Sequence, residues 1–518
     1  MKVVTVEQMQ ALEAESESRG VSTDRLMENA GLAVAEQAQA LIGDLKGEHI
    51  TVLVGPGNNG GDGLVAARHL NVWGGRVHIV LCSPRREGES KLEMLRDLVV
   101  DISELDGDVK PLAKALDSSR LVIDAVLGTG RSRPLQGTIR AALEQVQAAR
   151  KRHPDLLVLA VDVPSGLDAD TGKCDAASPA ADLTVALGFP KVGLFGFPGA
   201  VKVGRLVTVD IGIPGDLARD VSLELASAGW ARSVLPARPL NANKGTFGRV
   251  MVVAGSPDYI GAAYLACAGA IRVGAGLVTL AIARSLIPAI AARLPEVTYL
   301  PLQESEPGVV NGADSAKRVH QALPSYTTLL VGCGLSQRAE VSEMVRLLLT
   351  AMPSGVSPQI VIDADGLNIL SHTPNWWQRI HENAVLTPHP GEMARLAGRQ
   401  IDEVQADRLK ASRDAASRWR KTLLLKGAYS IVVMPEGQAM INPFANPALA
   451  TAGTGDVLAG AVAGLLAQGL SAFDAAAAGA YVHGAAGELV RDELGDAGMA
   501  ASDLLPAMPK AIKALHAS

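Results

Sequence analysis

The sequence predicts an α/β protein with parallel sheets covered by helices on both faces. Apolar runs typical of buried strands alternate with helical stretches along the chain, which is the pattern of doubly wound sheets. The chain has 518 residues, so two or three domains are expected. Aromatic residues make up only 3% of it, and the core must therefore be built from Ala, Val, Leu and Ile. Such a core suits α/β layers better than a β-sandwich.

The first half of the chain opens with helices and continues with strands. Residues 5–42 carry apolar residues at helical spacing with a break at Gly20, which predicts two helices. The strands expected after them are HITVLVG, RVHIVLC, LVIDAVLGTG, LLVLAVDVPSG, ADLTVALGF and RLVTVDIGI.

Residues 214–243 mark the domain boundary. Pro214, Pro236 and Pro239 fall in a stretch without a sustained strand pattern. We place the boundary near residue 225, to within about ten residues, which gives domains of residues 1–225 and 226–518. A second series then runs from GRVMVVAGS through GLVTLAIA, TLLVGCG, QIVIDADGLNIL, AVLTPHPGEMARLAG and KTLLLKGAYSIVVM to a Gly-rich helix. The two series share no repeat unit, so two different domains are expected.

Composition excludes several classes of function. The net charge is −6 and no long basic run is present, which argues against nucleic acid as a partner. The four cysteines lie far apart without a CxxC pair, which indicates a reducing compartment and no zinc site. Acidic residues interrupt the N-terminus and no clean apolar span occurs. We therefore expect a cytoplasmic protein with no membrane partner.

Three loops of the first domain follow strands, where parallel sheets place their ligands. They are GPGNNGGDG (residues 55–63), DAVLGTGR (residues 124–131) and DVPSGLD (residues 162–168). The glycines allow close approach of backbone to a phosphate, although the first loop is neither GxGxxG nor a Walker A motif. Asn59, Asp124 and Ser165 offer hard oxygen ligands for a monovalent or divalent cation. The alternative is that each of them only caps a helix or stabilises a turn.

The order and spacing of LMENAG, GPGNNGGDG, DAVLGTG and VDVPSG resemble the NAD(P)H-hydrate epimerase family, the YjeF N-terminal type, over roughly residues 5–225. This resemblance implies a Rossmann-like three-layer α/β/α sandwich and a K⁺ ion bound by Asn59, Asp124 and Ser165. It implies that the hydrate is bound by Asp162 and by two loops. These comprise Asn58, Asn59, Gly60, Gly61 and Asp62, and Gly128, Thr129, Gly130, Arg131, Ser132, Arg133 and Pro134.

A catalytic role for Asp162 follows as a hypothesis. Epimerisation at carbon 6 of the hydrate can proceed by loss and return of hydroxide, through an iminium cation. A carboxylate beside the ring would stabilise that cation and could shuttle the proton. The same fold occurs in binding modules, but Asp162 and the intact loops favour catalysis here.

The strongest signal of the second domain is Gly453-Thr454-Gly455-Asp456. Gly-rich backbone that turns into a helix forms an anion hole for a phosphoryl group. An Asp at that hole can accept the proton of an attacking hydroxyl. With the Ala/Gly-rich helix that follows, this segment resembles the ribokinase-like superfamily, whose α/β/α fold is expected for this domain.

Further motifs narrow the family. NKGTFGRVMVVAGS, GAAYLACAGAIRVGAGLV, VIDADGLN, TPHPGE and LLLKGAYSIV, with the AGTGD segment, resemble the ADP- or ATP-dependent NAD(P)H-hydrate dehydratase family over about residues 241–490. The resemblance implies that Asp456 is the catalytic base. It implies contacts from Ala262, Gly334 and His389 to the hydrate, and from Lys426, Gly427, Ala428, Tyr429, Ser430, Gly453, Thr454 and Gly455 to the nucleotide.

Simpler interpretations stay open for four of these residues. His389 could be a rigid turn residue between two prolines, and Lys426 could end a strand in solvent. Asp363 and Asp365 could help to bind Mg²⁺ or only cap a helix. Cys333 stands where the family pattern has Pro, which leaves the chemistry intact.

Both resemblances point to one metabolite, hydrated NADH or NADPH (NADHX and NADPHX). An epimerase would supply the epimer that the dehydratase uses. Phosphorylating a hydroxyl turns it into a good leaving group, so a kinase-like fold suits a dehydratase. The resemblance implies ADP as donor, giving AMP and phosphate, and a homo-oligomer. The alternative is a small-molecule kinase with an N-terminal regulatory domain, which would accumulate a phosphorylated product.

Overall fold

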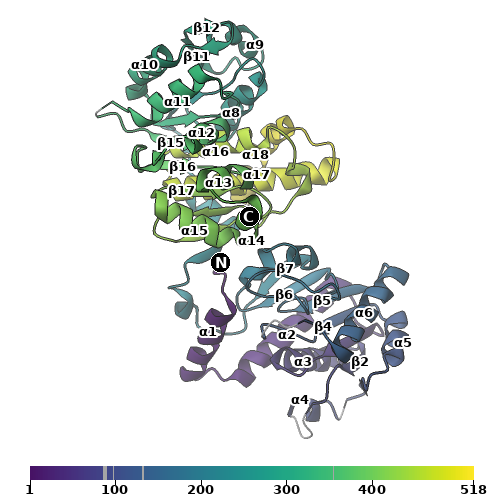
Figure 1. Cartoon of the computed structure of the whole chain (residues 1–518). Helices are drawn as coiled ribbons and strands as arrows, with labels where there is room; N and C mark the ends of the chain where they lie inside the picture. The colour runs from purple at the N-terminus through teal and green to yellow at the C-terminus, as the bar shows by residue number, and fades with distance from the viewer. Residues whose placement is uncertain (86–89, 97, 131–133, 354, 518) are drawn as a thin grey trace. The chain divides into compact units, whose positions relative to one another are not determined.

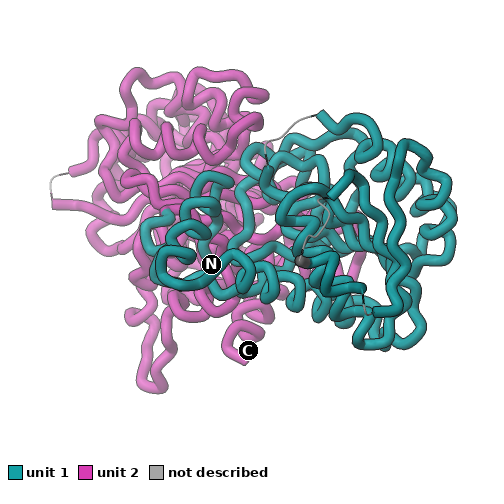
Figure 2. The backbone as a smooth tube through the Cα atoms, turned by 90° about the horizontal axis from the view of Figure 1, so that it is seen from below, with its two compact units in different colours: residues 1–221 teal, residues 222–518 magenta. Residues whose placement is uncertain are grey.

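The computed structural model describes residues 1–85, 90–96, 98–130, 134–353 and 355–517 (Figure 1). The chain forms two compact units, residues 1–221 and 222–518 (Figure 2). The division lies four residues before the boundary expected near residue 225. The reason is that the short strand β8, Leu223–Leu225, pairs with a strand of the second unit.

Unit 1 contains a seven-stranded sheet in which every pairing is parallel, in the order β3-β2-β1-β4-β5-β6-β7. Its core is the Rossmann-like order 3-2-1-4-5-6, which confirms the predicted fold class. The strands are β1 His49–Val54, β2 Arg76–Leu81, β3 Asp101–Glu104, β4 Leu121–Ala125, β5 Leu157–Val161, β6 Leu183–Leu187 and β7 Arg205–Val209.

Helices cover both faces of this sheet. The helices are α1 Val6–Ser18, α2 Thr23–Ile42, α3 Asn58–Val72, α4 Ser90–Glu93, α5 Lys110–Ser118 and α6 Gly137–Arg152, with 3₁₀ turns at Val192–Phe195, Gly199–Lys202 and Gly215–Ala218. Helices α1, α2 and α3 share one apolar core with the sheet, and α5 and α6 share the core on the opposite face. A capping box between Thr5 and Gln8 starts α1, and Ser22 caps α2. This places the helix that carries Glu13 against the strand ends.

Unit 2 contains a ten-stranded sheet in the order β11-β10-β9-β14-β15-β16-β17-β18-β19-β8. The strands are β9 Arg249–Val253, β10 Leu277–Ala283, β11 Thr298–Leu302, β14 Thr328–Val331, β15 Gln359–Ile362, β16 Ala384–Leu386, β17 Thr422–Leu425, β18 Ile431–Val433 and β19 Ala439–Ile441, with β8 at the edge. Pairing is parallel from β11 to β17 and antiparallel at β18. A separate hairpin joins β12 Glu304–Glu306 and β13 Val309–Val310.

The helices of unit 2 also form two layers (Figure 1). They are α7 Ala228–Val234, α8 Ile260–Arg272, α9 Ile287–Ala291, α10 Gly312–Ala322, α11 Ala339–Thr350, α12 Ala364–Ser371, α13 Pro390–Ala397, α14 Ile401–Ala406, α15 Arg408–Trp419, α16 Thr454–Ala467, α17 Ala472–Leu494 and α18 Leu504–Ala517. Helices α8, α16, α17 and α18 share one apolar core with the sheet. Short 3₁₀ turns lie at Arg284–Leu286, Leu323–Ser325, Trp376–Gln378, Pro447–Leu449 and Ala501–Asp503.

Small residues let α16 pack closely on α8. A Cβ on Gly460 would lie 2.0 Å from the carbonyl oxygen of Ala266, and one on Gly464 would lie 2.7 Å from that of Ala270. These glycines therefore fix the position of α16, whose first turn holds Asp456. Despite the apolar character of α16 and α17, none of the helices in the described parts of the chain is long and apolar enough to span a membrane.

Candidate active sites of the two units

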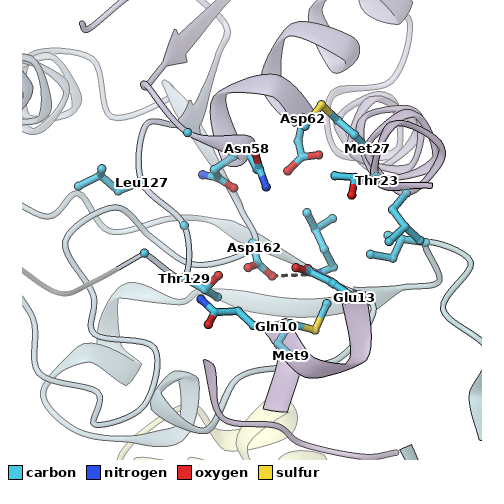
Figure 3. A pocket seen from close by; sticks show the side chains of 18 of the residues that line it. Met9, Gln10, Glu13, Thr23, Met27, Asn58, Asp62, Leu127, Thr129 and Asp162 are labelled. Carbon is cyan, nitrogen blue, oxygen red and sulfur yellow. Dashed lines mark hydrogen bonds between the residues drawn. The ribbon is translucent and has the colours of Figure 1, made fainter. Parts of the chain in front are cut away.

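Unit 1 has a cavity of about 460 Å³ at the carboxyl ends of its strands (Figure 3). It is lined by parts of α1 and α2, by the loops that follow β1 and β4, and by the ends of β5 and β6. Its lining residues are Met9, Gln10, Glu13, Thr23, Leu26, Met27, Ala30, Pro56, Gly57, Asn58, Asn59, Asp62, Val126, Leu127, Gly128, Thr129, Gly130, Asp162, Leu187, Lys191 and Ile211. The three loops expected from the sequence therefore meet at one site.

Asp162 follows β5 with a backbone φ of 65°, in the left-handed region that non-glycine residues rarely adopt. Such strain costs about 1–3 kcal/mol and clusters at functional sites. The N–H of Leu187 donates to Asp162 Oδ1 at 3.1 Å, and the buried amine of Lys191 donates to the same oxygen. Lys191 Nζ also donates to the carbonyl of Leu187 at 3.1 Å. The carboxylate is thus locked in place against a buried cation.

Two more carboxyl groups, those of Glu13 and Asp62, enter the cavity beside this ion pair (Figure 3). Within the described residues, neither side chain has a hydrogen bond or ion pair, so both are open to a ligand. Burial raises the pKa of Glu13, partly offset by Lys191. Burial raises the pKa of Asp62 well above its ordinary range, and the charges of Asp162 and Glu13 raise it further.

Glycines of the first loop let the start of α3 pack closely against neighbouring atoms. A Cβ on Gly60 would lie 2.2 Å from the carbonyl oxygen of Gly55, and one on Gly61 would lie 2.6 Å from Met27 Sδ. Gly60 and Gly61 are buried within α3 and are absent from the cavity lining given above. Of the second predicted loop, Gly128, Thr129 and Gly130 line the cavity and Pro134 is exposed. Arg131, Ser132 and Arg133 lie outside the described residues.

Asn59, which lines the cavity, lies near Asp124 and Ser165, which are absent from its lining. Ser165 Oγ donates to Asp124 Oδ1 at 2.6 Å, and the N–H of Leu127 donates to Ser165 Oγ at 2.8 Å. The next residue, Gly128, packs on the side chain of Asn59, because a Cβ there would lie 3.2 Å from Asn59 Oδ1. These contacts bring the three predicted cation ligands into one cluster.

The chemistry of this cluster fits a cation. Burial raises the pKa of Asp124, and its hydrogen-bond donors in the described structure are the neutral hydroxyl and N–H of Ser165 and the N–H of Val126. A buried carboxylate with only neutral donors lacks charge compensation. The buried Asn59 Nδ2 has no partner among the described residues, so that amide is not fixed by the protein. Oxygen ligands of this kind suit a hard cation.

In unit 2, Asp363 and Lys426 form a buried ion pair at the carboxyl ends of β15 and β17. Lys426 Nζ donates to Asp363 Oδ1 at 2.6 Å, and Thr387 Oγ1 donates to the same oxygen at 2.8 Å. Burial lowers the pKa of Lys426, but Asp363 and Glu392 outweigh it and the pKa rises. Lys426 is therefore a charged group inside the site, and the interpretation of it as a strand end in solvent is wrong.

Asp456 shares this site. One ligand atom from each of Cys333, Asp363 and Asp456 lies within 4.8 Å of the others. Burial and the charge of Asp363 raise the pKa of Asp456 to about 6. A carboxyl with this pKa is ionised at neutral pH and still basic enough to accept a proton in a reaction.

The first turn of α16 presents its N–H groups next to Asp456. Gly453, with φ of 93°, turns the chain into the helix. His483 Nε2 lies 2.9 Å from the carbonyl of Thr454, and burial lowers the pKa of His483 to about 4, so the neutral ring donates here. A Cβ on Gly455 would lie 3.4 Å from Lys426 Nζ, which places the lysine beside the anion hole.

The predicted nucleotide loop, residues 426–430, is held by Arg408, a residue that the sequence did not single out. Arg408 donates to the carbonyl oxygens of Leu425 (3.3 Å), Lys426 (3.1 Å) and Ala428. Burial lowers the pKa of Arg408 to about 10. The loop itself turns through Gly427 (φ 139°) and Tyr429 (φ 51°), and Ser430 Oγ closes it by donating to Gly427 O at 2.9 Å.

His389 caps helix α13. Its Nδ1 accepts hydrogen bonds from the N–H groups of Gly391 (3.0 Å) and Glu392 (3.4 Å), so Nε2 carries the proton, 3.3 Å from Glu392 Oε1. Burial, Lys426 and Arg395 lower the pKa of His389, which favours this neutral tautomer. His389 therefore acts as the turn residue that was expected between the two prolines. Its half-exposed ring also lies near Lys426.

Ala262 and Gly334, both predicted to contact the hydrate, lie against each other. Gly334 has φ of 59°, and a Cβ there would lie 2.7 Å from that of Ala262. Gly334 directly follows Cys333, whose Sγ lies 4.0 Å from Asp363 Oδ2. These contacts join the wall formed by α8 to the site of Asp363 and Asp456.

Sequence reasoning missed four charged residues of the two sites: Glu13, Lys191, Glu392 and Arg408. Glu392 belongs to the TPHPGE motif, and Lys191 comes two residues after the end of the predicted strand ADLTVALGF, so both had a signal in the sequence. Glu13 and Arg408 lie within ordinary amphipathic helices and had none. Burial raises the pKa of Glu392 to about 7.

Comparison with known proteins identifies a family for each of the two units. The family model described as YjeF-related protein N-terminus matches residues 23–193, and that of NAD(P)H-hydrate dehydratase matches residues 250–510. A bifunctional NAD(P)H-hydrate repair enzyme of Moorella thermoacetica is 39% identical, over 95% of this chain and 92% of its own length. That of Thermofilum pendens is 36% identical, over 100% and 97%.

The solved structure of a ribokinase-like superfamily protein from Enterococcus faecalis is 25% identical, covers 57% of this chain and 96% of its own, and has a TM-score of 0.50. This similarity agrees with the fold predicted for unit 2. Each of the two matched family models lies within one of the two units. The chain belongs to the family of bifunctional NAD(P)H-hydrate repair enzymes, with an epimerase domain followed by a dehydratase domain.

Proposed function

We propose that unit 1 interconverts the R and S epimers of NADHX and NADPHX at Asp162, and that unit 2 dehydrates the S epimer at Asp456 with ADP as phosphoryl donor. The observation that carries this proposal is the position of Asp456, a basic, partly buried carboxyl in the Gly-rich first turn of α16. Lys426 lies beside the same turn. This is the arrangement needed to activate a hydroxyl toward a bound phosphate.

In unit 2, Asp456 accepts the proton of the C6 hydroxyl as its oxygen attacks the β-phosphorus of ADP. The bond from that phosphorus to the bridging oxygen breaks, and AMP leaves. The N–H groups at the start of α16 and the charge of Lys426 stabilise the transferring group. Loss of phosphate from C6 and of a proton from C5 then restores the dihydropyridine ring. A kinase would stop at the phosphorylated product.

Magnesium would accompany the nucleotide in this proposal and would offset the negative charge of its phosphates. Asp363 Oδ1 already accepts hydrogen bonds from Lys426 and Thr387. Asp365 accepts from the N–H of Ser336 at 2.8 Å and from Gln337 Nε2 at 3.2 Å. Neither carboxyl group is wholly free to bind a metal ion.

Potassium binding by Asn59, Asp124 and Ser165 gives a testable expectation. Exchange of choline chloride for potassium chloride at equal ionic strength should raise the unfolding temperature of unit 1, because a ligand that binds only the folded state stabilises it. Asp124→Asn, which removes the buried charge, should abolish the rise. An equal rise in wild type and variant would place the ion elsewhere. Unfolding of unit 1 is followed by hydrogen exchange of its peptides at a series of temperatures.

The test of the whole proposal is the absorbance at 340 nm of purified protein with both hydrate epimers, magnesium, potassium and either ADP or ATP. Full recovery of reduced nicotinamide with ADP is expected. Asp162→Asn should stop once one epimer is consumed, provided it is read before spontaneous epimerisation. Recovery only with ATP would overturn the choice of donor. No recovery with either nucleotide would favour a small-molecule kinase.

A further inference from the structure

Three carboxyl groups, those of Glu13, Asp62 and Asp162, line the cavity of unit 1. Asp62, Glu13 and Asp162 interact electrostatically with one another, and Lys191 is the amine that pairs with Asp162. Asp162 is the partner of that amine, whereas Asp62 has no hydrogen-bond partner among the described residues. The cavity thus contains one carboxyl group that pairs with a buried amine and one that has no hydrogen-bond or ion-pair partner among the described residues.

We propose that Asp62 is a second catalytic residue of the epimerase, the acid that donates a proton to the departing C6 hydroxyl while Asp162 faces the ring from another wall of the cavity. This inference rests on the epimerase function proposed for unit 1. Figure 3 shows Asp62 extending from the α3 side and Asp162 from the strand end, with open space between them. The volume of about 460 Å³ has room for a nicotinamide-sized ring.

The proton and electron balance of the step is simple. The C6–O bond breaks and its electron pair leaves with the oxygen, which takes the proton of Asp62 and departs as water. The ring becomes an iminium cation opposite the negative Asp162. Water then adds to C6 from the other face and transfers a proton to Asp162. One carboxyl loses a proton and the other gains one, so the pair is ready for the reverse reaction and resets by exchange with solvent.

The surroundings of Asp62 favour its protonated form. Burial disfavours its charged form, and Asp162 and Glu13 repel that charge from two sides. Lys191 and Lys91 act in the opposite direction, but the pKa of Asp62 still lies well above its ordinary range. Two neighbouring carboxyls in different environments are the usual arrangement of an acid and a base.

The experiment follows the initial rate of epimer exchange by chromatography of single epimers across pH, with the spontaneous rate subtracted. Asp62→Asn, nearly isosteric, should lower the epimerase rate about 10²- to 10⁴-fold, the usual contribution of a general acid. In H₂¹⁸O, wild type should incorporate label at the C6 hydroxyl and the variant should not. Asp155→Asn, an exposed Asp of the same unit, is the matched control and should keep the wild-type rate.

The pH profile separates catalysis from a structural effect. The wild-type rate should fall as pH rises through the pKa of Asp62, because only the protonated acid can donate. Glu13→Gln removes a repelling charge and should move this falling limb to lower pH. The role of Asp62 would be overturned if Asp62→Asn kept the wild-type rate and pH profile. It would also be overturned if the falling limb of the pH profile stayed at the same pH in Glu13→Gln. In both cases the epimerase function would stand. Wild-type protein without epimerase activity would refute both. Wild-type hydrogen exchange of β4 and β5 amides in each variant shows that unit 1 has folded.

Discussion

Replacement of Asp456 by Asn should lower the dehydratase kcat/KM about 10²- to 10⁴-fold, the contribution expected of a general base, and leave the epimerase rate unchanged. Asn keeps the shape of the side chain at the start of α16 but cannot accept the hydroxyl proton. Asp474→Asn is the matched control, because Asp474 also lies in the first turn of a helix, away from the site. An equal loss of kcat/KM in Asp456→Asn and Asp474→Asn would mean that the loss comes from a less stable helix and not from a missing base.

The same residue predicts the pH dependence of dehydration. The reaction needs ionised Asp456, and the pKa of this group is raised to about 6. The rate should therefore be constant above pH 7 and fall about tenfold for each unit below about pH 6. The rate is measured from pH 5 to 8 with saturating nucleotide. A profile that is flat down to pH 5 would show that Asp456 does not carry the proton.

The fold was predictable because its signals are local. Each expected strand of unit 1 ends at a loop such as 55–63 or 162–168, and parallel strands bring such loops to one edge. The meeting of Asn59 with Ser165 follows from that rule alone. The same holds for Asp456 and Lys426 in unit 2, which are 30 positions apart in the chain yet adjacent in space.

What the sequence could not predict depends on distant packing. Glu13 belongs to α1, a helix that precedes the sheet in the chain. In the sequence it looks like any exposed acidic residue of a helix, and only the packing of α1 over the strand ends brings it to the cavity. Arg408 is partly buried against the loop at 425–428, whose carbonyl oxygens accept its hydrogen bonds. The raised pKa values of Asp62 and Asp456 likewise arise from burial among other charges. Tertiary contacts of this kind produce no hydrophobic periodicity and no motif by which they could be recognised in the sequence.

Lys191→Met should be the most destabilising single change in unit 1, and the loss should grow with pH. Lys191 is fully buried and its amine pairs with Asp162. Breaking a buried pair by removing one partner costs about 3–5 kcal/mol, because the other charge stays buried without compensation. Lys191 also lowers the pKa of both Glu13 and Asp62, so its removal should raise these pKa values further.

The direction of the pH effect follows from linkage. A carboxyl whose folded pKa is raised above its unfolded value binds its proton more tightly in the folded state. Its stabilising contribution is complete below the unfolded pKa and is lost as pH rises through the folded pKa. Lys191→Met should therefore be close to wild type in stability near pH 4.5 and furthest from it near pH 8.

Hydrogen exchange of amides in β4 and β5 reports the unfolding free energy of unit 1 separately from unit 2. Lys173→Met, at an exposed position of the same unit, is the matched control and should stay within about 0.5 kcal/mol of wild type. A loss in Lys191→Met that is equal at both pH values would mean that the lysine contributes packing alone. A loss that grows from acid to alkaline pH would show that its charge holds the three carboxyls of the cavity together, which is the condition for separating an acid from a base there.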